Sequence, residues 1–301
     1  MQNKTDECCQ NGRILKGIGG FYYVQLADGS VVECRARGKF RLDGQKPMPG
    51  DFVSILPPSD TQGGFVEEIC PRKNQLTRPM VANVDQLLIV VSAKKPKADL
   101  LLVDKLLLYA VWQGIPAVLA VNKVDTGGDT LECVRREYAA SGIEVLAVSA
   151  KTGEGLKELR EVLQNKNTCL AGQSAVGKSS LLNALQPDLA LATGGLSKKT
   201  DRGRHTTRHS ELMALPDLEA TVVDTPGFSI LECMDVQPEE LKDLYPEYLG
   251  ANCRFDGCLH YREPDCGVKE KVARGELSEE RHGRYIQILE ELLERRKKQY
   301  D

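Results

Sequence analysis

The sequence predicts a multidomain protein, with an N-terminal β-barrel, a central α/β domain and a C-terminal, mainly helical domain. Three observations lead to this prediction. Short alternating strands with glycine turns fill residues 12–69, apolar runs alternate with helical patterns over residues 86–224, and a cysteine and histidine cluster precedes a final helix. We expect the domains to span residues 1–75, 76–230 and 231–301.

Length and composition are compatible with this organisation. The 301 residues suffice for two or three domains, and 41% hydrophobic residues suffice for a core. A net charge of −3 excludes a generally cationic nucleic-acid coat, so RNA contact would have to use local patches. Because the first residues are polar and no apolar run reaches membrane length, we expect a soluble, cytoplasmic protein without membrane contact.

The N-terminal residues predict an OB-fold, a small barrel that commonly binds nucleic acid. Apolar and polar residues alternate on both sides of the hairpin dipeptide Asp28-Gly29, and short strands recur at Pro49–Leu56 and Gly64–Ile69. Four cations recur at a spacing of two, so we expect them on one strand face beside Phe40: Arg35, Arg37, Lys39 and Arg41. This face would contact RNA or would be an ordinary solvated surface.

The central residues predict a mostly parallel sheet with helices on both faces. Strand-length apolar runs cover residues 86–91, 115–121, 144–148, 167–171 and 219–223, and the clearest helix is Asp99–Trp112. In such a sheet a nucleotide would bind at the carboxyl ends of the strands.

The loop after the fourth run matches G-x-x-x-x-G-K-[ST], a phosphate-binding loop (P-loop). Backbone N–H groups and the next helix N-terminus would surround the phosphates. Lys178 would reach the β- and γ-phosphates, and Ser179 would ligate Mg²⁺. We expect nucleotide contacts from Gly172, Gln173, Ser174, Ala175, Val176, Gly177, Lys178, Ser179 and Ser180.

Two other loops predict that the base is guanine. In Asn122-Lys-Val-Asp125, the Asp125 carboxylate can accept both the N1–H and the N2 amino group of guanine, a pair that adenine lacks. Asn122 would fix the loop and touch the base edge, and the Lys123 stem would lie on the base plane. The run 144–148 leads into a second, small loop that would close over the base: Ser149, Ala150 and Lys151.

Two switch segments complete the predicted phosphate site. In Asp224-Thr-Pro-Gly227, Asp224 would hold Mg²⁺ through water and the Gly227 N–H would sense the γ-phosphate. The polar stretch 198–208 suits a switch loop in which either Thr206 or Thr207 supplies a metal-binding hydroxyl. The predicted magnesium ligands are Ser179, Thr207 and Asp224.

A cluster of three thiols and one imidazole predicts a structural Zn²⁺ site in the C-terminal region. A disulfide framework is the alternative, but ten scattered cysteines with an adjacent pair do not form a regular scaffold. The predicted ligands are Cys253, Cys258, His260 and Cys266.

The order of these elements, with both guanine loops before the P-loop, resembles that of circularly permuted GTPases of the ribosome small-subunit-dependent family (RsgA). The resemblance includes the cysteine and histidine cluster and covers nearly the whole chain. It implies a GTP hydrolase that acts in late maturation of the small (30S) ribosomal subunit and is stimulated by binding the subunit and its 16S rRNA. It also implies one structural Zn²⁺ per chain and Mg²⁺ with GTP, and we expect a monomer.

The sequence departs from Ras-like enzymes at the catalytic group. The alternative function is a GTP-dependent RNA-binding switch in which hydrolysis is incidental. Phe228 follows the Asp-x-x-Gly motif, where Ras-like enzymes have a water-orienting glutamine, so another polar group has to take that role. We predict two catalytic residues, His205 in the switch stretch and Lys178 in the P-loop. The resemblance also favours His205, but a surface or RNA-facing histidine is the other interpretation.

Overall fold

The computed structural model describes residues 9–42, 44–59, 62–77, 79–189, 191, 211–224 and 235–300. The chain divides into two compact units. The first unit takes in residues 1–86, 163–170 and 198–228, and the second takes in residues 87–162, 171–197 and 229–301.

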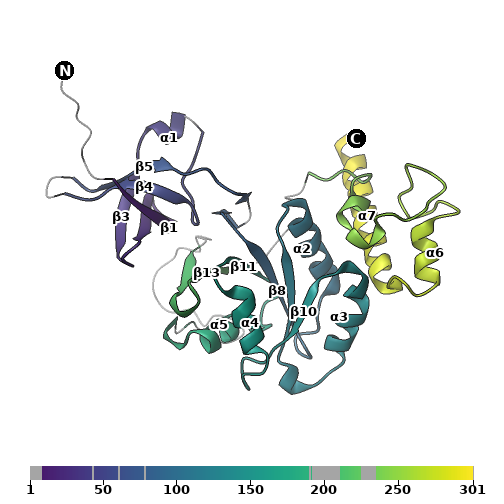
Figure 1. Cartoon of the computed structure of the whole chain (residues 1–301). Helices are drawn as coiled ribbons and strands as arrows, with labels where there is room; N and C mark the ends of the chain where they lie inside the picture. The colour runs from purple at the N-terminus through teal and green to yellow at the C-terminus, as the bar shows by residue number, and fades with distance from the viewer. Residues whose placement is uncertain are drawn as a thin grey trace. The chain divides into compact units, whose positions relative to one another are not determined.

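A closed five-stranded barrel forms most of the first unit (Figure 1), as the OB-fold prediction requires. Its strand order is β1-β2-β3-β5-β4, with β3 and β5 parallel and the other printed pairs antiparallel. Ile14, Val24, Ile55 and Val66 fill the interior and are fully buried. The strands are β1 (Gln10–Ile18), β2 (Phe21–Leu26), β3 (Val31–Ala36), β4 (Phe52–Leu56) and β5 (Gly64–Ile69).

The predicted strand face with four cations does not form. The strand β3 ends before three of them, and Lys39 and Arg41 belong to the short helix α1 (Lys39–Leu42). The chain turns here because the ring of Phe40 enters the barrel core, and its backbone N–H donates to the carbonyl of Arg37 at 3.2 Å. The shared face of Arg35, Arg37, Lys39 and Arg41 was therefore wrong, whereas their contact with RNA stays a prediction.

The segment 75–83 contains a small two-stranded sheet of β6 (Gln75–Leu76) and β7 (Val81–Ala82). It lies against the barrel. Gly50 has a φ of +92°, and a Cβ there would stand 2.1 Å from the carbonyl oxygen of Ala82, so only glycine allows this approach. Two hydrogen bonds hold the contact: Ala82 N to Pro49 O at 2.9 Å and Asn83 Nδ2 to Gly50 O at 3.0 Å.

The central sheet has six strands in the order β10-β9-β8-β11-β13-β12. The pairs β10–β9, β8–β9 and β11–β13 are parallel, as predicted, and β12 pairs antiparallel with β13 at the edge. The edge strand was not predicted because its four residues show no pattern that separates them from a loop. The strands are β8 (Gln86–Ser92), β9 (Ala117–Asn122), β10 (Glu144–Ala147), β11 (Asn167–Ala171), β12 (Leu212–Leu215) and β13 (Ala220–Asp224).

Helices connect these strands. The predicted helix is α2 (Leu100–Trp112), and its N-cap Asp99 accepts from the Leu102 N–H at 3.0 Å. Figure 1 shows α2 and α3 on one face of β8–β10 and α4 on the other, as right-handed crossovers require. The other helices here are α3 (Thr130–Tyr138), α4 (Leu156–Leu163), α5 (Lys178–Leu185) and the short 3-10 turns η1 (Val124–Thr126), η2 (Ala139–Ser141), η3 (Pro187–Leu189) and η4 (Pro216–Leu218).

The C-terminal region of the second unit is mainly helical, as predicted. The hydroxyl of Ser278 accepts from the Arg281 N–H at 3.1 Å and caps the last helix. Among the described residues, no helix combines the length and apolar character needed to cross a membrane. The helices are η6 (Leu241–Leu244), η7 (Pro246–Tyr248), α6 (Gly267–Ala273) and α7 (Glu279–Tyr300).

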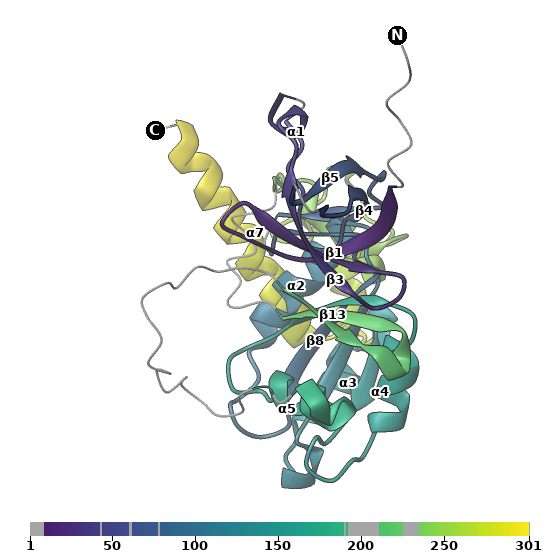
Figure 2. The ribbon, with the colours of Figure 1, turned by 90° about the vertical axis from the view of Figure 1, so that its left-hand side faces the viewer.

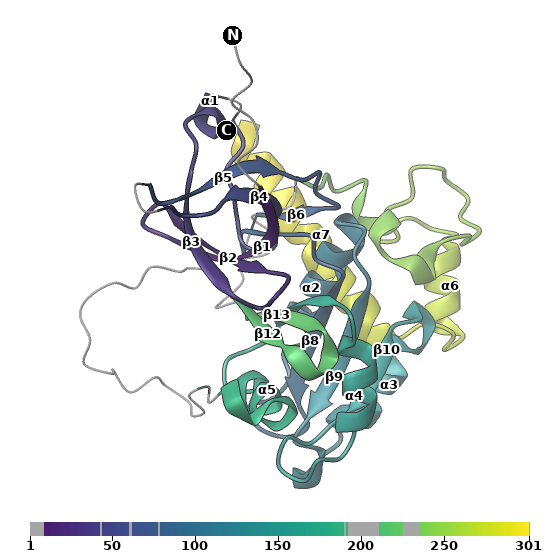
Figure 3. The ribbon, with the colours of Figure 1, turned by 60° about the vertical axis from the view of Figure 1, so that its left-hand side comes forward.

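The helix α7 runs beside α2 within the second unit (Figures 2 and 3), and a buried carboxylate fixes this contact. Asp104 on α2 is fully buried and forms ion pairs with both Arg281 and Arg284 on α7. The hydroxyl of Tyr138 donates to the same carboxylate at 2.8 Å, and Arg284 also pairs with Glu137 of α3 at 2.7 Å. The Asp104 carboxylate on α2 thus contacts side chains from both α3 and α7.

We expect Asp104→Asn to lower the free energy of unfolding by about 3–5 kcal/mol, because it leaves two buried arginines without their shared counter-ion. Urea denaturation would measure this. The control is Lys105→Gln, which breaks an exposed pair with Glu291 and should cost less than about 1 kcal/mol. Equal losses in the two variants would contradict a structural role for Asp104.

Candidate functional site

The P-loop joins the end of β11 to the start of α5 in a conformation that requires glycine. Gly172 has a φ of +130°, and a Cβ there would stand 2.1 Å from the carbonyl oxygen of Val90. Gly177 has a φ of +100°, and a Cβ there would stand 2.4 Å from Nδ2 of Asn122. Ala175 between them is also left-handed, with a φ of 64°. The glycines of the motif are therefore required by close contacts within the second unit.

Lys178 lies across this loop. Its ammonium donates to the carbonyl oxygens of Gly172 at 2.9 Å and Gln173 at 3.0 Å, so a positive charge stands beside the loop that would hold phosphates. Gln173 is itself tied to α2, since its side-chain oxygen accepts from the Asp99 N–H at 3.1 Å. Ser179 and Ser180 are half-buried in the first turn of α5, and Ser174 is exposed.

Asn122 connects the two guanine loops with the P-loop. This buried side chain ends β9, and its Nδ2 donates to the carbonyl of Val176 at 2.9 Å. Its Oδ1 accepts from the N–H of Lys123 at 2.8 Å and from the N–H of Ala150 at 3.3 Å. One amide therefore holds three loops together, which agrees with its predicted role of fixing the loop.

Asp125 faces the second guanine loop. One of its carboxylate oxygens accepts from the hydroxyl of buried Ser149 at 2.6 Å. Lys123 extends along the P-loop, with its ammonium 2.7 Å from the carbonyl oxygen of Ala175. Lys151 is exposed. The structure thus brings the predicted guanine residues and the P-loop to one end of the strands β8–β11.

Part of the predicted site lies outside the described residues. His205, Thr206, Thr207 and Gly227 belong to this part. Asp224 ends β13, and the structure does not describe its side chain. The catalytic histidine and the magnesium ligands therefore stay predictions.

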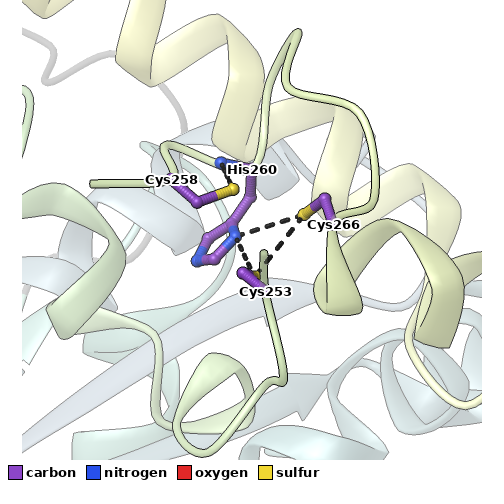
Figure 4. A group of neighbouring side chains, drawn as sticks. All are labelled: Cys253, Cys258, His260 and Cys266. Atoms are coloured by element: carbon purple, nitrogen blue, oxygen red, sulfur yellow. Dashed lines mark hydrogen bonds between the residues drawn. The ribbon is translucent and has the colours of Figure 1, made fainter. Parts of the chain in front are cut away.

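The four predicted metal ligands meet in the C-terminal region (Figure 4). Their ligand atoms all lie within 4.8 Å of one another. Nδ1 of His260 lies 3.5 Å from the sulfur of Cys253 and 3.3 Å from that of Cys266, and those two sulfurs are 3.9 Å apart. A tetrahedron with zinc–ligand bonds of ordinary length has S···S edges of about 3.8 Å and S···N edges of about 3.5 Å. The three distances among Cys253, His260 and Cys266 match these edges, and the sulfur of Cys258 lies within 4.8 Å of the other ligand atoms, so the cluster could hold one metal ion.

The electrostatics of the cluster also suit a cation. Burial raises the pKa of the Cys258 thiol to about 12 and lowers the pKa of His260, which keeps the imidazole neutral. Burial also opposes ionisation of Cys253, but the N–H groups of Gly267 and Val268 lower its pKa overall. A cation would favour the deprotonated form of all three thiols, the form that binds metal.

Glu263, which the sequence analysis missed, shapes the loop that carries His260. Its two carboxylate oxygens accept from the N–H groups of Leu259 and Tyr261, each at 3.0 Å. His260 itself has a positive φ of 55°, a conformation that such anchors on both sides can hold. A His-x-x-Glu spacing was the available signal, but a carboxylate in a loop has no periodicity to identify it.

Family comparisons agree with this geometry. A model of the RsgA GTPase matches residues 69–234, and a model of the RsgA N-terminal domain matches residues 11–65. The chain belongs to the RsgA GTPase family. One relative, a small ribosomal subunit biogenesis GTPase RsgA of Caldanaerobacter subterraneus subsp. tengcongensis, is 44% identical over 292 residues, which cover 96% of this chain and 98% of the relative.

Two solved structures resemble the chain along nearly its whole length. YjeQ from Thermotoga maritima gives a TM-score of 0.80 at 37% identity and covers 95% of this chain and 99% of its own. YloQ, described as a circularly permuted GTPase, gives a TM-score of 0.76 at 35% identity and covers 98% of this chain and 99% of its own. In this RsgA family member the guanine loop likewise follows β9 and the P-loop follows β11, which confirms the permuted order.

We expect Asp125→Asn to weaken GTP binding at least about tenfold and to shift preference towards xanthine nucleotides, because the amide presents a donor where guanine needs an acceptor. Titration with fluorescent GTP and XTP analogues would measure both affinities. Ser149→Ala, which removes only the hydroxyl that contacts Asp125, is the control and should keep the preference for guanine. Unchanged GTP affinity in Asp125→Asn would remove this residue from the base site.

Proposed function

We propose that this chain is the GTP hydrolase that acts in late maturation of the small ribosomal subunit in its cell, and that the subunit stimulates hydrolysis. The main observation that supports this proposal is that the Asn122 side chain holds the P-loop and both guanine loops together. The printed name of its relatives, small ribosomal subunit biogenesis GTPase, supports the choice of partner. On this proposal the protein is cytoplasmic, works as a monomer and contacts 16S rRNA.

The chemistry follows from the loops. Lys178 and the N–H groups at the start of α5 would stabilise the negative charge that develops on the phosphates. Mg²⁺, held by Ser179, Thr207 and Asp224, would neutralise charge on the β- and γ-phosphate oxygens. Asp125 and Asn122 would fix the base, which orients the phosphate chain for attack by water.

The barrel surface supports contact with RNA. Among the barrel residues that the structure describes, five cations lie over aromatic rings. Arg35 lies 4.7 Å from the Phe21 centroid, Arg37 lies 5.1 Å from that of Phe65, and Lys16 lies 5.3 Å from that of Tyr23. The other two are Arg13 over Phe52 and Lys39 over Phe40. Aromatic rings beside cations are the features on which OB-folds stack bases and neutralise phosphates. Of the four cations predicted to contact RNA, Arg35 and Arg37 have such ring partners on β2 and β5.

We propose zinc as the metal of the cysteine and histidine cluster, because three thiolates and one imidazole in a closed tetrahedral arrangement suit this ion. The purified protein should contain one Zn²⁺ per chain by elemental analysis. Cys258→Ser should lose the metal together with the cooperative folding of the residues around the cluster, as measured by hydrogen exchange. Cys70→Ser, which changes an exposed cysteine outside the cluster, should keep both. Protein purified without metal would refute the assignment.

The function is tested by the GTPase rate with and without purified small subunits. We expect strong stimulation of kcat in the parent protein and its loss in His205→Ala, with GTP and subunit affinities nearly unchanged, because the histidine would act only on the attacking water. Lys178→Ala, which removes charge from the P-loop, should lose turnover altogether. An unstimulated parent would favour the RNA-binding switch, and full stimulation in His205→Ala would assign the water-orienting role to another group.

A further inference from the structure

Arg13 of the barrel forms a hydrogen bond with a strand of the central sheet, and both residues of this bond belong to the first unit. Its NH1 donates to the hydroxyl of Thr221 at 3.0 Å, and that hydroxyl donates to Oδ1 of Asn167 at 2.9 Å. Asn167 and Thr221 are register partners on the parallel strands β11 and β13. One hydroxyl therefore joins a barrel strand to two neighbouring strands of the sheet.

These strands lead to the phosphate elements. Asn167 is the first residue of β11, which runs into the P-loop, and Thr221 is the second residue of β13, which ends at Asp224. Because each residue of a strand advances about 3.3 Å, Thr221 and Asp224 are separated by about 10 Å of hydrogen-bonded backbone. The bonded residues thus lie at the amino ends of the strands whose carboxyl ends carry the predicted phosphate chemistry.

The contact is embedded in buried polar groups. Asn167 is 2% exposed, and its Nδ2 donates to the carbonyl of Asn83 at 2.8 Å, while its N–H donates to Asp85 at 2.8 Å. Burial lowers the pKa of the Arg13 guanidinium, and the nearby Asp85 carboxylate opposes this effect. The arginine is desolvated on this side, so a change in its position would alter the hydrogen bonds of its buried partners.

The opposite side of Arg13 faces the barrel surface. Its guanidinium lies 5.1 Å from the ring centroid of Phe52, which is its register partner on β4 and is 49% exposed. A second contact lies along the same strand, where Lys16 pairs with Glu211 at 2.9 Å and forms a backbone bridge to it. Glu211 directly precedes β12, the antiparallel partner of β13.

We propose that Arg13 is a positioning residue for GTP hydrolysis, which links the exposed ring of Phe52 through Thr221 to the strand that ends at Asp224. A nucleobase stacked on Phe52 would compete with Arg13 for the same face of the ring. The Arg13 guanidinium would then move, and its hydrogen bond to Thr221 would change. The shift would travel along β13, because a hydrogen-bonded strand in a packed sheet moves as a unit. This inference rests on the proposed function and adds the route by which bound RNA raises turnover.

The test compares two substitutions of Thr221. Thr221→Val keeps the shape but removes the hydroxyl, whereas Thr221→Ser keeps the hydroxyl and both of its hydrogen bonds. We expect kcat in the presence of purified small subunits to fall about tenfold in Thr221→Val, the size of an ordinary coupling between sites, and to stay near the parent value in Thr221→Ser. Basal turnover, the KM for GTP and sedimentation with the subunit should stay unchanged in both variants.

The outcomes separate the two proposals. Full stimulation of Thr221→Val would overturn the positioning role while leaving the proposed function intact, and a parent that subunits do not stimulate would overturn both. Arg13→Met provides a second route if Thr221→Val unfolds, because it removes the guanidinium and keeps the bond from Thr221 to Asn167. It should show the same selective loss of stimulated turnover, and a normal stimulated rate in a folded Arg13→Met would likewise overturn the inference.

Discussion

One buried amide organises the nucleotide site. Asn122 donates to the backbone of the P-loop and accepts from the backbones of both guanine loops, so these three segments cannot separate without leaving polar groups unpaired in the interior. The glycine at 177 is required by the same residue, since any side chain there would collide with its Nδ2. The site therefore depends on where the strands end and not on the order in which the chain visits them, which explains why a permuted order is compatible with it.

A second constraint acts in the C-terminal region. The last helix, α7, is fixed against α2 by Asp104, which forms ion pairs with both Arg281 and Arg284. Such buried ion pairs add little net stability relative to apolar packing, but breaking one is costly, so they select one arrangement over others. The cysteine and histidine cluster lies in the loops between η7 and α6, and the hydroxyl of Tyr285 on α7 donates to the carbonyl of Leu259 inside those loops at 2.6 Å. The helix α7 therefore contacts both these loops and the helix α2.

Most of the fold was predictable because its signals are local. Apolar runs identified five strands of the sheet, the P-loop and the guanine loops followed from fixed spacings, and the four metal ligands followed from residue type. The failures depend on tertiary packing. Arg35 and Lys39 do not share a face because burying Phe40 ends the strand, an outcome that alternation of cations cannot reveal. The sequence analysis did not single out Asp104, because its arginine partners lie far along the chain.

The contact of Asp104 with α7 and the contact of Thr221 with the barrel differ in strength, and this difference suits different roles. Asp104 has two desolvated cationic partners, and losing such a partner costs about 3–5 kcal/mol, so breaking this contact is costly. Thr221 is held by two hydrogen bonds through its hydroxyl. The bond from the charged Arg13 guanidinium has a net value of about 1.5–3 kcal/mol, and the bond to Asn167 has one of about 1 kcal/mol. A coupling of 1–3 kcal/mol from a bound partner, the usual range for linked sites, can reset the second kind of contact but not the first. The barrel contact is therefore the adjustable one, and the contact of α7 with α2 and α3 is the fixed one.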